Sequence, residues 1–226
     1  MKYGTARGKP RWRCRACWSQ FTGTPAPRPK PAARQAAVTL YSRGLSLRAT
    51  GQLLGTTAQS VLRWVCDYVD ALCPKPVPGS APVVEIDELW HYVGFKANKL
   101  SIWKAVDRAT GRLIDWQCGD RSEAAAGALL ERLQAWSVRL FCTDSYASYE
   151  TLLRVGRHYQ GNDQTVRVER DNGRQRHWIA ACRRKSIVVS KTVDMVNRRM
   201  ALYAHFHPNG QADPKMARLP LLAPSA

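Results

Sequence analysis

Apolar residues recur every three or four positions between residues 31 and 72, a spacing that predicts helices. A first helix is predicted over residues 32–44, where Gly44 closes it, and a second, short helix begins after Ser46. A longer helix is predicted over residues 56–72, with these apolar positions at helical spacing: Val61, Leu62, Val65, Val69 and Leu72. A short helix, a tight turn and a longer helix in succession predict a helix-turn-helix.

Strand-like patterns begin after a segment that contains four prolines. Three successive strands joined by turns are predicted over residues 82–95, 99–108 and 111–119, and they form an antiparallel meander. Trp90, Trp103 and Trp116 lie on these strands, and we expect them to fill the core.

A helix, a second kind of strand and further helices follow the meander. The helix is predicted over residues 122–136 with Ser122 as its N-cap, and the short apolar run at 138–144 predicts a buried strand. The last helical region runs from about Thr165 toward Lys185. This order predicts a ribonuclease-H-like α/β domain, a mixed sheet with flanking helices, preceded by a small helix-turn-helix domain.

Composition divides the chain into five segments. They are a basic, aromatic and Pro-rich segment (1–30), the predicted helix-turn-helix domain (31–72), a Pro-rich linker (73–82), the α/β domain (83–207) and a tail (208–226).

The charge of the chain points to a polyanionic partner. Lys and Arg number 35 against 17 Asp and Glu, which gives a net charge of +18 and a pI of about 10.1. Up to residue 82 there are 13 basic and 2 acidic residues, so the N-terminal part is the more densely charged. This pattern favours double-stranded DNA as a partner and gives no indication of a membrane.

Seven cysteines are scattered along the chain, and only Cys14 and Cys17 have a motif spacing. The other five are expected to be buried thiols of a reducing compartment: Cys66, Cys73, Cys118, Cys142 and Cys182. The N-terminus has no apolar core that could serve as a signal peptide. We therefore expect a cytoplasmic protein.

In a helix-turn-helix, the N-terminal residues of the second helix face the major groove of DNA. The residues expected to contact DNA are Thr57, Gln59, Ser60 and Arg63, with Arg48 near the backbone. The alternative is a three-helix packing unit without DNA contact.

Two buried strands are each followed by an aspartate, Asp87 after "VVEI" and Asp144 after "RLFCT". If these strands pair, the two carboxylates meet at one edge of the sheet, and Glu169 in the last helical region is the candidate for a third. Clustered carboxylates repel one another, and two Mg²⁺ ions (or Mn²⁺) would relieve the repulsion and promote phosphoryl transfer. Asn172 and Arg176 share a helix face with Glu169. Taken alone, each of these acids is more typical of a turn, a cap or the surface.

Neighbouring acidic residues offer alternatives to this set. Asp107 ends the second predicted strand and is the next candidate carboxylate. By strand alternation, Glu85 shares a sheet face with Asp87, whereas Glu88 does not.

The chain resembles the transposases of the insertion sequence 1 family, a DDE-type group, over most of residues 7–206. The matching segments are "IDELWHYV", "LSIWKAVDRATGRLIDWQCGDRSEAAAGALLERL", "FCTDSYASY" and "ERDNGRQR…RRKSIVVSKTVDMVNRRMALY". The resemblance implies that Asp87, Asp144 and Glu169 are the catalytic acids and metal ligands. It also implies catalytic roles for Asn172 and for Arg176, which would bind a DNA phosphate.

Residues 154–199 hold 12 basic and 4 acidic residues, so several of the basic side chains are expected to contact phosphates. The candidates are Arg170, Arg174, Arg183, Arg184 and Lys185.

The chain departs from this family at its N-terminus. Family members usually begin with a zinc ribbon of two C-x-x-C knuckles, and "RWRCRACWSQF" supplies only the second, with Cys14 and Cys17. Two thiols do not complete a tetrahedral site, so bound Zn²⁺ is doubtful and residues 1–30 are interpreted as a remnant of the ribbon. We expect either a start upstream of Met1 or a decayed element.

The leading functional hypothesis is a transposase that binds the terminal inverted repeats of its element, cleaves the DNA and transfers the strand to a target. The resemblance implies a homo-oligomer that acts on paired ends. The alternatives are a non-catalytic DNA-binding repressor derived from a decayed transposase, and a resolvase or nuclease on the same fold.

Overall fold

The computed structural model describes residues 1–6, 8–22, 31–144, 148–153 and 156–209. The chain forms two compact units, Met1–Ala33 and Arg34 onward, and each is described by itself.

The first unit is a small antiparallel sheet that sequence patterns did not predict. Its three strands, in spatial order, are β1 (Lys2–Ala6), β2 (Lys9–Arg13) and β3 (Gln20–Thr22). The C-x-x-C motif lies in the connection from β2 to β3, where the Cys14 N–H donates to the carbonyl of Ser19 at 2.9 Å. Cys14 is partly exposed and Cys17 is exposed.

The second unit begins with the predicted helices. They are α1 (Pro31–Ser42), α2 (Leu47–Leu53) and α3 (Ala58–Leu72). The hydroxyl of Ser46 caps α2 and that of Thr57 caps α3, each accepting a backbone N–H at 3.1 Å. A Cβ on Gly51 would lie 2.8 Å from the carbonyl oxygen of Thr56, so α2 approaches the start of α3 as closely as glycine allows.

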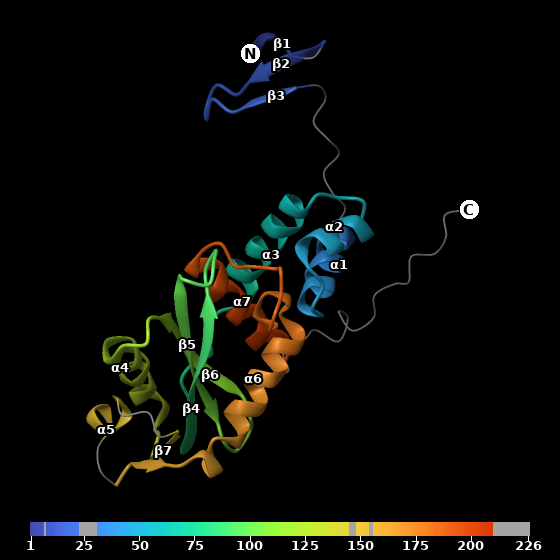
Figure 1. Ribbon diagram of the computed structural model, residues 1–226. Helices are drawn as coiled ribbons and strands as arrows, with labels where there is room; N and C mark the ends of the chain where they lie inside the picture. The colour runs from blue at the N-terminus through green and yellow to red at the C-terminus, as the bar shows by residue number, and fades with distance from the viewer. Residues whose placement is uncertain (7, 23–30, 145–147, 154–155, 210–226) are drawn as a thin grey trace. The chain divides into compact units, whose positions relative to one another are not determined.

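A five-stranded mixed sheet forms the centre of this unit (Figure 1). Its strands are β4 (Val83–Tyr92), β5 (Lys99–Asp107), β6 (Leu113–Gly119), β7 (Leu140–Thr143) and β8 (His158–Gln160), and their spatial order is β6-β5-β4-β7-β8. The first three pair antiparallel, as the meander predicted, whereas β7 is parallel to β4 and β8 is parallel to β7. β8 was not predicted from the sequence.

Helices cover both faces of the sheet (Figure 1). They are α4 (Glu123–Leu133), α5 (Ser148–Leu152), α6 (Val166–Trp178) and α7 (Val193–Phe206), with 3₁₀ turns at Gln134–Trp136, Asn162–Gln164 and Ala180–Cys182. On one face, Ile86 and Trp103 pack with α4 and α5 in a hydrophobic cluster. On the other, Leu89 and Ile102 pack with α6 and α7, and the same cluster includes residues of α1 and α3. The N-terminal helices therefore share a core with the sheet.

The three strand tryptophans do not all fill the core. Trp103 and Trp116 are buried, as predicted. Trp90 is 51% exposed, so its prediction was wrong. The side chain of Trp90 borders a hollow whose other lining residues are polar, among them Lys99 and Arg121.

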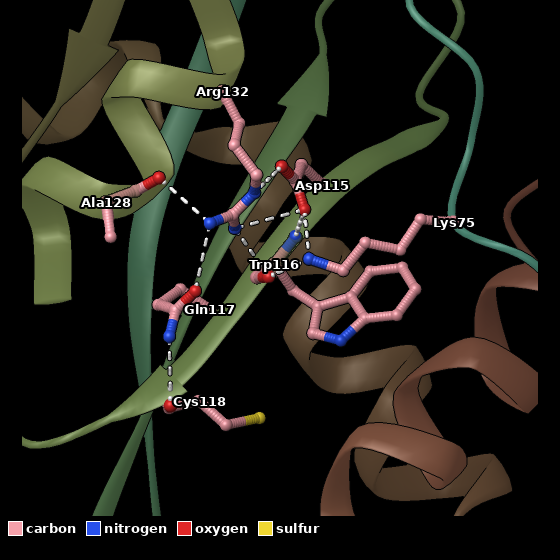
Figure 2. Close-up of polar contacts among 7 residues, drawn as sticks. All are labelled: Lys75, Asp115, Trp116, Gln117, Cys118, Ala128 and Arg132. Carbon is pink, nitrogen blue, oxygen red and sulfur yellow. Dashed lines mark hydrogen bonds and ion pairs between the residues drawn. The ribbon is translucent and has the colours of Figure 1, made fainter.

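The Pro-rich linker is bonded to the sheet (Figure 2). The ammonium of Lys75 donates to a carboxylate oxygen of Asp115 at 2.6 Å and to the carbonyl of Trp116 at 2.8 Å. Arg132 of α4 reaches the same carboxylate, with its Nε 2.7 Å from Asp115 Oδ2. Asp115 therefore joins the linker, β6 and α4.

All seven cysteines are free thiols. Of the five predicted to be buried, Cys73, Cys118 and Cys142 are buried, whereas Cys66 and Cys182 are partly exposed. Within the described ranges, every helix is too short or too polar to cross a lipid bilayer.

Candidate active site

The pairing of β4 with β7 brings two of the predicted acids together. The parallel register runs from Val83 opposite Leu140 to Glu85 opposite Cys142. Continued by two residues, this register sets Asp87 beside Asp144, on strands that are about 4.8 Å apart. Asp87 was predicted to end its strand, and this prediction was wrong. Asp87 lies in the middle of β4, just beyond the part of the strand that pairs with β7.

Helix α6 carries the third predicted acid, Glu169, and brings Asn172 into contact with Asp87. The side-chain amide of Asn172 donates to Asp87 Oδ2 at 2.6 Å, while the Glu88 N–H donates to Oδ1 at 2.7 Å. Glu169, one turn before Asn172, is exposed and accepts the hydroxyl of Thr165 at 3.2 Å.

The electrostatics of Asp87 reflect these neighbours. Burial raises the pKa of the Asp87 carboxyl, the Glu88 N–H lowers it, and the negative charges of Asp144 and Glu169 raise it further. The positive charge of Lys104 acts in the opposite direction. The negative charges of Asp144 and Glu169 therefore both act on Asp87.

Glu85 connects the strand that carries Asp87 to the helix that carries Glu169. Its carboxylate is 1% exposed and accepts the backbone N–H groups of Arg167 at 2.7 Å and Val168 at 3.0 Å. Both N–H groups belong to the first turn of α6 and have no acceptor within the helix, so Glu85 supplies it. The helix dipole also stabilises a negative charge at this end. As strand alternation predicted, Glu85 faces α6 with Asp87, whereas Glu88 accepts the hydroxyl of Ser101 at 2.5 Å on the opposite face.

Lys104 was not among the site residues predicted from the sequence. It lies opposite Asp87 in the β4–β5 register and is fully buried. Its ammonium donates to Asn172 Oδ1 at 3.0 Å and forms an ion pair with Asp171, which also accepts the hydroxyl of Tyr203 at 2.5 Å. The available signal was a single lysine in the apolar run "LSIWKAVD".

The alternative carboxylate, Asp107, has a structural role. Its side chain accepts the N–H groups of Ala109 and Thr110, both at 3.2 Å, and the hydroxyl of Thr110 at 2.5 Å. Asp107 therefore closes the turn between β5 and β6.

The predicted DNA-contacting basic residues of the C-terminal half lie in different environments. Burial and the charge of Arg184 lower the pKa of Arg176, and the charge of Asp87 raises it. Four others are exposed: Arg170, Arg174, Arg184 and Lys185. Arg183 is exposed too, but it donates to the carbonyls of Gly44 and His177, each at 3.1 Å.

The predicted DNA-contacting residues of the helix-turn-helix segment lie on α2 and at the start of α3. Arg48, Gln59 and Arg63 are exposed, and the last two are one turn apart on α3. The hydroxyls of Thr57 and Ser60 lie 3.0 Å apart in the N-terminal cap of α3, so both already take part in the local structure.

Residues 81–208, more than half of the chain, match the family model for IS1 transposase. The chain belongs to the IS1 transposase family. Among curated proteins, InsB of insertion element IS1 2 from Escherichia coli (strain K12) is 33% identical over 128 residues, which cover 56% of this chain and 77% of InsB. InsB of insertion element IS1 9, from the same strain, is 32% identical over the same length and coverage.

Two solved structures share a weaker likeness with this IS1-family chain. The catalytic core domain of BIV integrase has a TM-score of 0.39 and 17% identity, covering 56% of this chain and 83% of that one. A chain of the simian T-cell lymphotropic virus intasome in complex with PP2A regulatory subunit B56 gamma has a TM-score of 0.39 and 16% identity, covering 75% of this chain and 64% of that one. At these scores the likeness does not assign a fold.

The donor set of the IS1-family site suits a hard divalent cation, because all three predicted ligands are carboxylates. Each oxygen of Asp87 accepts one hydrogen bond and keeps lone pairs for a further partner. Across the described part of the chain, no three His, Cys, Asp or Glu side chains lie close enough together to hold an ion. The carboxylates of Asp87, Asp144 and Glu169 would therefore have to close around it.

Among the residues that the structure describes, no third ligand joins Cys14 and Cys17. Cys17 Sγ lies 3.0 Å from the hydroxyl of Ser19, and hydrogen bonds from Ser19 and Cys14 lower the pKa of its thiol. Such a thiol is a better metal ligand than an ordinary cysteine. The cysteine pair supplies two of the four ligands that a structural Zn²⁺ site needs.

Proposed function

We propose that this chain is the transposase of a bacterial insertion sequence. It binds the terminal inverted repeats of its element, cleaves the DNA in the presence of Mg²⁺ or Mn²⁺, and joins the new 3′-hydroxyl to target DNA. Membership of the IS1 transposase family supports the proposal. So does the strand order, in which a three-stranded meander is extended by two parallel strands, the arrangement expected of a ribonuclease-H-like catalytic domain.

The observation that best supports the proposal is the β4–β7 register, which would set Asp87 beside Asp144 if continued by two residues. The negative charge of Glu169 on α6 acts on Asp87 together with that of Asp144. Asp87, Asp144 and Glu169 would hold the metal ions. Two ions bound there activate the attacking water or hydroxyl and stabilise the leaving oxygen of an in-line displacement.

The other residues of the site hold and orient these groups. Asn172 is a positioning residue, because its amide fixes one oxygen of Asp87. Arg176 stays protonated and lies beside Asp87, where it would bind the phosphate next to the scissile bond.

Charge supports DNA as the partner. The net charge is +18, and exposed basic residues lie on α6 and on the segment after it. We propose that Gln59 and Arg63 of α3 contact bases in the major groove, and that Arg48 contacts the backbone. The transposase is proposed to act as a homo-oligomer on paired ends.

The test uses a plasmid that carries the gene with several hundred base pairs of its natural flanks on both sides. Purified full-length protein is incubated with this plasmid and Mg²⁺ or Mn²⁺, and nicked, excised and joined products are measured. The wild type is expected to cleave at both flanks only with metal. Asp144→Asn and Glu169→Gln are expected to abolish cleavage while DNA binding persists.

The matched control is Glu131→Gln, which changes an exposed glutamate of α4 in the same way as Glu169→Gln and is expected to leave cleavage unchanged. Cleavage that persists in Asp144→Asn contradicts the mechanism. Flank binding without metal-dependent cleavage supports the repressor instead, and a preference for branched DNA over the flanks supports a resolvase.

A further inference from the structure

We propose that Lys104 is a positioning residue of the active site: its ammonium fixes the Asn172 amide so that the amide N–H points at Asp87 and holds this carboxylate ready to ligate a divalent ion. This inference rests on the proposed function. It adds to that site a buried cation which neither touches DNA nor ligates the metal.

The direction of the Asn172 amide follows from the chemistry of lysine. An ammonium group has three donors and no acceptor, so a side-chain amide in contact with it must offer its oxygen. Lys104 Nζ lies 3.0 Å from Asn172 Oδ1, which leaves the amide nitrogen to donate to Asp87 Oδ2 at 2.6 Å. Lys104 and Asp87 therefore favour the same orientation of the amide, and without Lys104 only the carboxylate would hold it.

Lys104 also sets the position of α6 against the sheet. It bonds two consecutive residues of the helix, Asp171 through an ion pair and Asn172 through a hydrogen bond. Asp171 is 2% exposed, and Tyr203 of α7 donates to its other carboxylate oxygen at 2.5 Å. The lysine charge is therefore balanced at a buried site, which is the condition for keeping an ammonium group out of water.

A purely structural role would be the alternative: the Lys104–Asp171 ion pair would only join α6 to β5. The two roles predict different outcomes for two variants. Asp171→Asn removes the ion pair and keeps the bond from Lys104 to Asn172. The double variant Lys104→Met/Asp171→Asn removes both and leaves no unpaired carboxylate in the core.

Metal binding is measured by titrating each full-length protein with Mn²⁺ and following the loss of the free Mn²⁺ electron paramagnetic resonance signal. Asp171→Asn is expected to leave the midpoint of the Mn²⁺ titration unchanged. The double variant is expected to raise it about tenfold or more, as for other groups that orient metal ligands. Cleavage of the flank plasmid by the double variant is expected to recover its maximum rate at high Mn²⁺, because the ligands themselves remain.

Equal midpoints for the two variants, or for the double variant and the wild type, overturn the role of Lys104. If the wild type cleaves and binds Mn²⁺ in that case, the proposed transposase activity still stands. If the wild type binds no Mn²⁺ and does not cleave, both proposals fail.

A second measurement needs no variant and so does not depend on how the double variant folds. Neutron diffraction from crystals of the wild-type protein shows the deuterons of the Asn172 amide. Deuterons that point at Asp87 support the inference, and an amide oxygen that points at Asp87 overturns it.

Discussion

Replacement of Glu85 tests how the sheet holds the helix that carries Glu169. Two backbone N–H groups at the start of α6, those of Arg167 and Val168, donate to one buried oxygen of Glu85. Glu85→Gln keeps an oxygen acceptor but removes the charge. Glu85→Ala leaves both donors without a partner in the interior.

The expected costs follow from the two hydrogen bonds. A bond to a charged acceptor is worth roughly 1 kcal/mol more than a bond to a neutral one, so Glu85→Gln should lower the free energy of unfolding by about 2 kcal/mol. Loss of both partners leaves one buried and one partly buried N–H group unsatisfied, at a cost of up to about 4 kcal/mol together, which is the expected effect of Glu85→Ala. At about 3 °C per kcal/mol for a chain of this size, the melting temperature should fall by roughly 6 and 12 °C.

Denaturant unfolding followed by circular dichroism measures these differences, and hydrogen exchange of the Arg167 and Val168 amides shows whether the loss is local. Glu131→Gln, on the exposed side of α4, is the matched control and should change stability little. Equal stability of wild type and Glu85→Ala, or unchanged exchange at the two amides, would refute the reasoning.

Three further predictions concern other contacts. Asn172→Asp replaces the donor to Asp87 by a carboxylate. Metal-dependent cleavage should fall about 10- to 100-fold, while flank binding measured by gel shift stays unchanged. Equal cleavage rates for the variant and the wild type would contradict this. Gly44→Ala should be less stable than Gly94→Ala in thermal unfolding. Both glycines have positive φ, but only at Gly44 of the two would an added Cβ meet Arg183, at 2.6 Å. Equal losses of melting temperature would contradict the clash. Burial and nearby positive charge lower the pKa of His91 to about 4. The stability that neutral His91 contributes is therefore fully present above about pH 6.5 and is lost as the pH falls toward 4. Unfolding curves across this range should show that the wild type loses about 3 kcal/mol more than His91→Gln, and parallel pH profiles would contradict it.

The sequence predicted the antiparallel meander and the buried strand at β7, because these depend on local patterns of apolar residues, and its local acidic residues supplied the candidate ligands. It did not specify the register between β4 and β7, which depends on packing between distant segments. Asp87 lies in the middle of its strand because β4 stays paired with β5 as far as Tyr92. Its proximity to Asp144 was therefore a hypothesis until the strands were paired.

Other features had weak local signals. β8 has three residues, too few for a recognisable alternation. The burial of Lys104 could not be predicted from the apolar run around it, because its partners Asp171 and Asn172 lie on a helix much later in the chain. Trp90 is a large aromatic residue on a predicted strand, which favoured a core position, but its side chain is half exposed.

The most direct test of the central claim is a crystal structure of the protein with flank DNA and Mn²⁺, in which anomalous scattering locates the ions. The account predicts manganese peaks ligated by Asp87 and Asp144, with Glu169 turned toward them, next to a DNA phosphate. Manganese bound elsewhere, with these three carboxylates still apart, would contradict it.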